Sequence, residues 1–290
     1  GTYSAPYLGP HLIVNAALRR GTYSAPYLGP HLIVNAALNT VAGQELAYRD
    51  RKCESFVLTP RDCGSQSTGY RPLTSASGKH MTLGRAMSIS GAAIDPNMSF
   101  HQSAPMTAML TLFNARLGWW LQNPKHPRPG GLPWAARSPY FNYLLWDELF
   151  GQTSSEGEYI HLSDGGHFEN LGVYELIKRR CRFIIALDAG EDNSAVDGNL
   201  ANLIRLIRID FGVRVTLDAA PLTETGPEKQ AKQHCVIGAI HYEDVDPGAE
   251  PGVLIYVKIS MTGDESPDLL QYAATTPFPH HPTFPDQFFD

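Results

Sequence analysis

One short segment of the chain concentrates side chains that can do acid–base chemistry. Residues 161–166 read His-Leu-Ser-Asp-Gly-Gly and complete a run with strand character. Asp164 is therefore expected at the carboxyl end of a strand, where catalytic groups gather in open parallel sheets. Gly165 and Gly166 allow a sharp turn and keep side chains away from the carboxylate. Such a carboxylate can act as a general base; the alternative is that Asp164 only caps the next helix or closes an Asx turn.

The same segment offers a second chemistry, because it holds four residues of metal-binding type: His161, Asp164, His167 and Glu169. Their spacing differs from the helix-borne H-E-x-x-H motif, and the P-C-x-x-C partner of a zinc deaminase is absent from the sequence. We predict no metal at this segment and keep a metal-dependent hydrolase as an alternative. His167, Glu169 and Asn170 are expected to rim the crevice or to cap the next helix.

The elements that must position this segment follow from the spacing of apolar residues. Strand patterns cover residues 56–60, 159–163, 182–187, 213–217, 235–242 and 254–259, and helical patterns cover 83–93, 106–121, 140–150, 171–180 and 199–211. Residues 61–80 and 122–139 are rich in Gly, Ser, Thr or Pro and are expected to be loops. A strand, a turn, a helix and a strand within residues 159–187 predict a right-handed βαβ unit. The predicted class is α/β, with helices layered on a mostly parallel sheet.

Composition and charge exclude several classes of function. The 23 basic and 29 acidic side chains give a net charge of −6, and the longest basic run is Lys178-Arg179-Arg180, so we predict no nucleic-acid partner. No apolar stretch approaches the roughly 18–20 residues of a spanning helix, and no signal peptide opens the sequence. We expect a protein that is cytoplasmic or peripheral to the membrane. Trp119 and Trp120 at the end of the 106–121 helix either rest on a lipid surface or lie in the core.

The string from His161 to Gly166, continuing as HFENLGVYELIKRRCRFIIALDAG, resembles the second catalytic segment of the patatin-like and cytosolic phospholipase A families of lipid acyl hydrolases. In those families an Asp-Gly-Gly or Asp-Gly-Ala turn carries the aspartate of a Ser–Asp dyad. The resemblance assigns this role to Asp164 and matches Asp188 to the acid that ends the next strand. Residues 86–98 are similar to the small-residue helix that precedes the dyad aspartate, and the resemblance spans about residues 30–220.

This resemblance implies a bacterial-type acyl hydrolase with a three-layer α/β/α fold, a lipid or phospholipid substrate and no cofactor. A serine on a G-x-S-x-G elbow attacks the ester and gives its proton directly to the aspartate. The sequence contains no G-x-S-x-G; Ser67 and Ser90 come nearest, and each lacks the first glycine. We therefore predict that the nucleophile lies in an N-terminal part of the catalytic domain outside these residues and that the chain alone is inactive. The alternative is a non-catalytic lipid-binding or scaffold module with this fold.

Residues 1–18 recur letter for letter as residues 21–38. True structural repeats drift in sequence and need about three copies to bury a core, so this duplication does not indicate a repeat fold. The second copy alone continues into coherent sequence. We predict that residues 1–20 lie outside the core and that residues 21–290 form one partial catalytic domain.

Overall fold

The computed structural model of the chain describes residues 31–40, 51–73, 81–91, 119–126, 153–190, 198–224 and 230–276. These residues fall into two compact units, one within residues 1–170 and the other within residues 171–290. None of the helices in the described ranges is long and apolar enough to cross a membrane.

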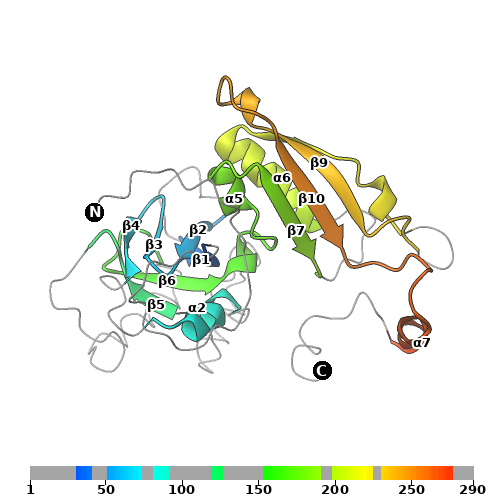
Figure 1. Cartoon of the computed structure of the whole chain (residues 1–290). Helices are drawn as coiled ribbons and strands as arrows, with labels where there is room; N and C mark the ends of the chain where they lie inside the picture. The colour runs from blue at the N-terminus through cyan, green and yellow to red at the C-terminus, as the bar shows by residue number, and fades with distance from the viewer. Residues whose placement is uncertain are drawn as a thin grey trace. The chain divides into compact units, whose positions relative to one another are not determined.

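The first unit is built on sheet A, whose strand order is β4-β3-β2-β1-β6-β5 (Figure 1). Its strands are β1 (Val34–Asn39), β2 (Cys53–Leu58), β3 (Asp62–Ser65), β4 (Gly69–Pro72), β5 (Trp119–Gln122) and β6 (Tyr159–Asp164). All neighbouring strands in this sheet are antiparallel. Ala36 of β1 pairs with Asp164, so the end of β6 lies against the middle of β1.

Helix α2 (Leu83–Ser90) packs on one face of sheet A. Thr82 caps it, because the Thr82 hydroxyl accepts the Arg85 N–H at 3.2 Å. Its inward side chains, Ala86 and Ile89, join the apolar residues of β1, β2 and β6 in one buried cluster. This core fixes the register of β6, because a shift by one residue would turn the buried Ile160 and Leu162 to the other face.

The second unit is built on sheet B, with strand order β7-β10-β9-β8. Its strands are β7 (Phe183–Asp188), β8 (Arg214–Thr216), β9 (Cys235–His241) and β10 (Gly252–Lys258), and its helices are α5 (Tyr174–Lys178), α6 (Gly198–Phe211) and α7 (Pro267–Thr275). Strand β10 is parallel to β7 and antiparallel to β9. Helix α6 lies along one face of the sheet (Figure 1), and its apolar stripe is buried there: Leu200, Leu203, Leu206 and Ile207.

The topology corrects the expected βαβ unit and the mostly parallel central sheet. Strands β6 and β7 were expected to be parallel neighbours, but β6 lies in sheet A and β7 in sheet B. Both edges of β6 are occupied by antiparallel partners, β1 and β5, so β7 has no edge of β6 to pair with. Among the described strands, β7 and β10 form the one parallel pair. The fold is mixed α/β, with one antiparallel and one mixed sheet.

Two further expectations, one for a loop and one for a helix, are wrong. The predicted loop 61–80 contains the β3–β4 hairpin, which closes at Gly69 with a positive φ of 70°. The predicted helix 106–121 ends in strand instead, since Trp119–Gln122 pairs with β6. Trp120 is 7% exposed and Trp119 packs against the core, so within sheet A these side chains form no lipid-facing helix surface.

The remaining predicted elements divide into two groups. The strands expected within 56–60, 159–163, 182–187, 213–217, 235–242 and 254–259, and the helices within 83–93 and 199–211, are confirmed with small shifts of their ends, while the 171–180 helix is reduced to α5. Residues 1–20, most of the helix 106–121, most of the loop 122–139 and the helix 140–150 lie outside the described residues. Predictions for these segments remain predictions.

Candidate active site

Asp164 ends strand β6 and begins a tight turn. A 3₁₀ turn, η3 (Gly165–His167), follows it directly, and the Asp164 Oδ1 accepts the Gly166 N–H at 2.7 Å. The N–H groups of Phe168 and Glu169 both bond to the Gly165 carbonyl at 3.0 Å. The Asx-turn alternative is thus realised by Oδ1, while Oδ2 accepts no hydrogen bond from the described residues.

The two glycines of the turn meet different neighbours. A Cβ on Gly165 would lie 2.7 Å from the Asn35 carbonyl oxygen of the neighbouring strand. A Cβ on Gly166 would lie 2.3 Å from the Asn170 Oδ1 and 3.2 Å from the Asp164 Oδ1. A larger residue at Gly165 would push the turn and its carboxylate away from β1, whereas at Gly166 it would meet the side chains of the exposed Asn170 and of Asp164.

Burial raises the pKa of Asp164 above its ordinary value of 3.8, while the Gly166 N–H and the charge of His167 oppose this shift. Desolvation of the carboxylate is the dominant cause. An ionised carboxylate with a raised pKa is a better proton acceptor than an ordinary aspartate. The Asp164 carboxylate therefore binds a proton more strongly than an ordinary aspartate does.

The side chains beside Asp164 form a buried polar chain. The Asn39 amide donates to the His161 Nδ1 at 2.8 Å, and its carbonyl accepts from the Ser163 hydroxyl at 3.3 Å. The Ser163 oxygen in turn lies 3.1 Å from the His167 Nδ1, which donates to it. Ser163 is fully buried and its hydroxyl donates a hydrogen bond to Asn39, so it is not placed to act as a nucleophile. Asn39, which the sequence analysis overlooked, joins β1 to β6 here.

The expected rim residues lie at the turn in different ways. His167 is half-buried and bonded to Ser163, and Asn170 is exposed with its side chain over Gly166. Glu169 is 5% exposed. Asp188, the acid matched by resemblance, belongs to sheet B, where it accepts the Tyr256 hydroxyl at 2.6 Å and the Gly190 N–H at 2.9 Å. The hydrogen bond between Asp188 and Tyr256 joins β7 to β10.

The metal alternative finds little support in the donor geometry. His161, Asp164, His167 and Glu169 are all described, yet they do not form a group of converging ligand atoms. The described group with donor atoms within 4.8 Å of one another is His234, Asp264 and Glu265 in the second unit. Glu265 accepts the N–H groups of Thr262 and Gly263 there, at 2.6 and 2.8 Å, so it closes the turn that leads into α7.

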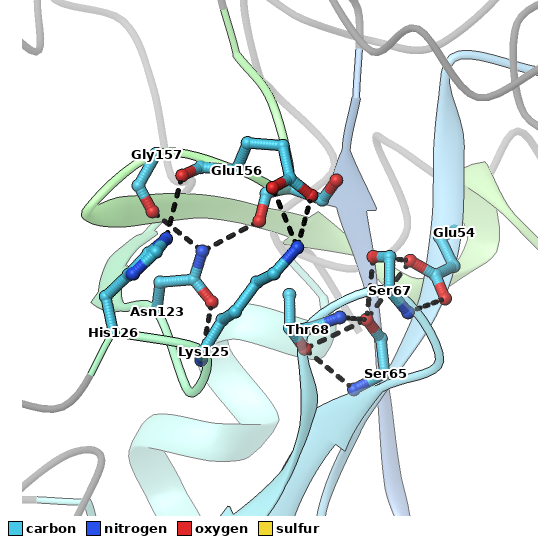
Figure 2. A network of polar contacts seen from close by, with 10 residues as sticks. Glu54, Ser65, Ser67, Thr68, Asn123, Lys125, His126, Glu156 and Gly157 are labelled. Atoms are coloured by element: carbon cyan, nitrogen blue, oxygen red, sulfur yellow. Dashed lines mark hydrogen bonds and ion pairs between the residues drawn. The ribbon is translucent and has the colours of Figure 1, made fainter.

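The two serines nearest to the elbow motif stand on no strand-to-helix elbow. Ser67 lies in the β3–β4 turn, and both its hydroxyl and its N–H donate to the Glu54 carboxylate (Figure 2). The Ser65 hydroxyl donates to the same carboxylate at 3.1 Å. Glu54 is 3% exposed, and burial raises its pKa. Ser90 is the last residue of α2.

A second polar cluster holds the start of β6 in place (Figure 2). Asn123, just after β5, is 1% exposed, and its amide donates to the carbonyls of Ser155 and Gly157, each at 2.7 Å. Outside this buried centre, the Lys125 ammonium pairs with Glu156 at 2.7 Å. The cluster joins β5 to the segment that enters β6, and so it helps to position Asp164.

Comparisons with protein-family models and with curated proteins gave no match. Among solved structures, the chain is similar to the human GIVD cytosolic phospholipase A2, with 14% sequence identity and a TM-score of 0.43. The similarity covers 83% of this chain and 38% of the phospholipase chain.

Proposed function

We propose that this chain supplies the general base of a serine-dependent acyl hydrolase that acts on lipid esters, with Asp164 as that base. The proposal rests on the hydrogen bonding and the burial of the Asp164 carboxylate. Its Oδ1 is held by the Gly166 N–H at 2.7 Å, burial raises its pKa, and its Oδ2 is left without a donor among the described residues. A fixed, desolvated carboxylate with one unoccupied oxygen suits a single proton acceptor.

In the proposed reaction, a serine Oγ attacks the ester carbonyl carbon and its proton passes to the Asp164 Oδ2. The leaving alcohol takes that proton as the single bond between the acyl carbon and the alcohol oxygen breaks, and an acyl-serine remains. Water then attacks the acyl group while Asp164 accepts its proton, the bond between the acyl carbon and the serine Oγ breaks and releases the carboxylic acid, and Asp164 returns the proton to the serine Oγ. The turn keeps the carboxylate in one position through these steps, because Gly165 packs against the β1 backbone and the Gly166 N–H holds Oδ1.

The serine itself is proposed to come from polypeptide outside these 290 residues. Among the serines weighed for this role, Ser163 is buried and bonded to Asn39, Ser67 is bonded to Glu54, and Ser90 ends a helix. The test starts with sequencing of the coding DNA upstream of Gly1. We expect it to encode, in the same reading frame, a G-x-S-x-G motif. The longer product should hydrolyse a short-chain nitrophenyl ester.

Asp164→Asn in that product should lower kcat/KM by roughly 10²–10⁴, the usual contribution of a general base. Asp62→Asn, at an exposed position of β3, is the matched control and should leave the rate unchanged. Because the base must be ionised and burial raises its pKa, activity should be lost as pH falls, with a midpoint above 3.8. Full activity in Asp164→Asn would contradict the proposal, and lipid binding without turnover would favour the non-catalytic module.

A further inference from the structure

One face of sheet B carries a regular grid of apolar side chains that none of the described helices of the second unit covers. The register of β7, β10 and β9 sets these side chains in three rows across the strands. The rows are Phe183–Val253–Ala239, Ile185–Ile255–Ile237 and Leu187–Val257–Cys235. We call these nine residues the open face. The opposite face of the same strands is buried under α6, as Figure 1 shows.

The open face is exposed to an extent that is unusual for such residues. Phe183, Ile185 and Leu187 are 67%, 61% and 71% exposed, and Ile237 is 69% exposed. Nine side chains of this kind present a contiguous apolar area on the order of 600 Å², at the upper limit for a monomeric protein. That area approaches the roughly 800 Å² that each partner buries in a standard protein interface.

We infer that the open face binds the open face of a second copy of this chain, so that two B sheets pack face to face in a symmetric dimer. Apolar sheets pack in this way when their side chains interdigitate about 10 Å apart. A two-fold interface requires one surface to be complementary to itself. The sizes of the side chains in the three rows meet this requirement.

The middle row consists of three isoleucines. In each of the two outer rows, the side chain on β7 is large and the side chain on β9 is small. A two-fold axis parallel to β10 and passing over Ile255 places β7 of one copy over β9 of the other. Phe183 then lies over the partner's Ala239, and Leu187 lies over the partner's Cys235. An axis perpendicular to the strands would instead set Phe183 against Leu187 and leave the small residues facing each other. Packing density therefore selects the axis along β10.

The first test is the oligomeric state of the full chain, measured by light scattering after size exclusion across a concentration series. The wild-type chain should be a dimer. Ile185→Glu places a charge in the middle row on the edge strand β7 and should weaken dimerisation at least tenfold. Ile209→Glu is the matched control: Ile209 is 60% exposed on α6, outside the open face, and its variant should remain dimeric.

The second test uses the native Cys235, which is exposed and carries a free thiol. It reports the position of the partner directly, without a substitution that must break the dimer. Leu187→Cys should form an intermolecular disulfide with the partner's Cys235 under mild oxidation. Phe183→Cys lies two rows away from that thiol and should cross-link far less. A Cys235→Ser background should abolish the Leu187→Cys cross-link.

A wild-type chain that stays monomeric at all concentrations would overturn the inference, as would equal cross-linking of the two cysteine variants. A monomer that binds phosphatidylcholine vesicles through Ile185 would assign the face to lipid instead. A monomer in which maleimide fails to reach Cys235 would assign it to another segment of the chain. The dimer does not depend on Asp164, so Asp164→Asn should dimerise as the wild type does.

Discussion

The first unit uses two carboxylates, the buried Glu54 and the half-buried Asp164, in different ways. Burial raises the pKa of both. Glu54 is surrounded by donors, because the hydroxyls of Ser65 and Ser67 and the Ser67 N–H all point to it. Asp164 accepts one N–H, from Gly166. A carboxylate whose oxygens are occupied organises a turn, whereas one with an unoccupied oxygen remains available to a reacting proton.

Glu54 should make the stability of the first unit depend on pH in a defined direction. Its folded pKa is raised above 4.5, so the folded state holds the proton longer than the unfolded state does. Its contribution is therefore fully present below pH 4.5 and is lost as pH rises through the raised folded value. Glu54→Gln should reduce this fall in the free energy of unfolding, measured by urea titration at several pH values, and leave the part that comes from Asp164, whose pKa burial also raises.

Glu156→Gln provides the control for that measurement. The hydrogen bond from Lys125 lowers the pKa of Glu156, so its small contribution has the opposite sign and is lost as pH falls below 4.5. The fall above pH 4.5 should persist in Glu156→Gln. An unchanged pH profile in Glu54→Gln would contradict the role assigned to Glu54.

At the scale of elements, strand β6 is the part that positions the candidate base. Strands β1 and β5 pair with both of its edges, and the residues of its inner face are buried under α2. The turn that follows is fixed by two glycines that fit against Asn35 and Asn170. The site therefore depends on an element whose pairing and packing leave little freedom.

Alanine at two glycines should change stability in opposite directions. Gly165→Ala puts a Cβ 2.7 Å from the Asn35 carbonyl oxygen and should destabilise the protein by about 1–3 kcal/mol. Gly84→Ala, in helix α2, meets no atom within 4 Å and should stabilise it by about 0.5 kcal/mol through the unfolded state. Thermal unfolding of the two variants checks this. Equal effects would show that the turn relaxes around the added methyl group.

The cluster that leads into β6 should owe its stability to Asn123 and little to its ion pair. Asn123→Ala leaves the carbonyls of Ser155 and Gly157 without their donor and should cost about 1–3 kcal/mol. Lys125→Ala removes a bridge whose partners are 42% and 67% exposed, and solvent screening should limit its cost to about 0.5 kcal/mol. Urea denaturation of both variants compares them. A larger loss in Lys125→Ala would reverse the assignment.

At the scale of the whole molecule, the chain holds a candidate base without a described partner serine. The 290-residue chain alone should therefore show no turnover of a nitrophenyl ester above background. It should also take up no fluorophosphonate probe at serine, which mass spectrometry of the treated protein would detect. Labelling of Ser67 that disappears in Glu54→Gln would contradict this expectation and move the nucleophile to the β3–β4 turn.

The sequence by itself determined the local features: the strand that ends at Asp164, the Asp-Gly-Gly turn, and the apolar runs that mark β7, β9 and β10. These depend on side-chain periodicity and on glycine, which act within a few residues. Only the tertiary structure decided that β6 and β7 belong to different sheets, that Trp119 and Trp120 form a strand, and that Asn39 and Glu54 gather polar partners. Strand pairing and buried hydrogen bonds join residues far apart in the chain, and the local pattern does not specify which distant edge or donor is closest.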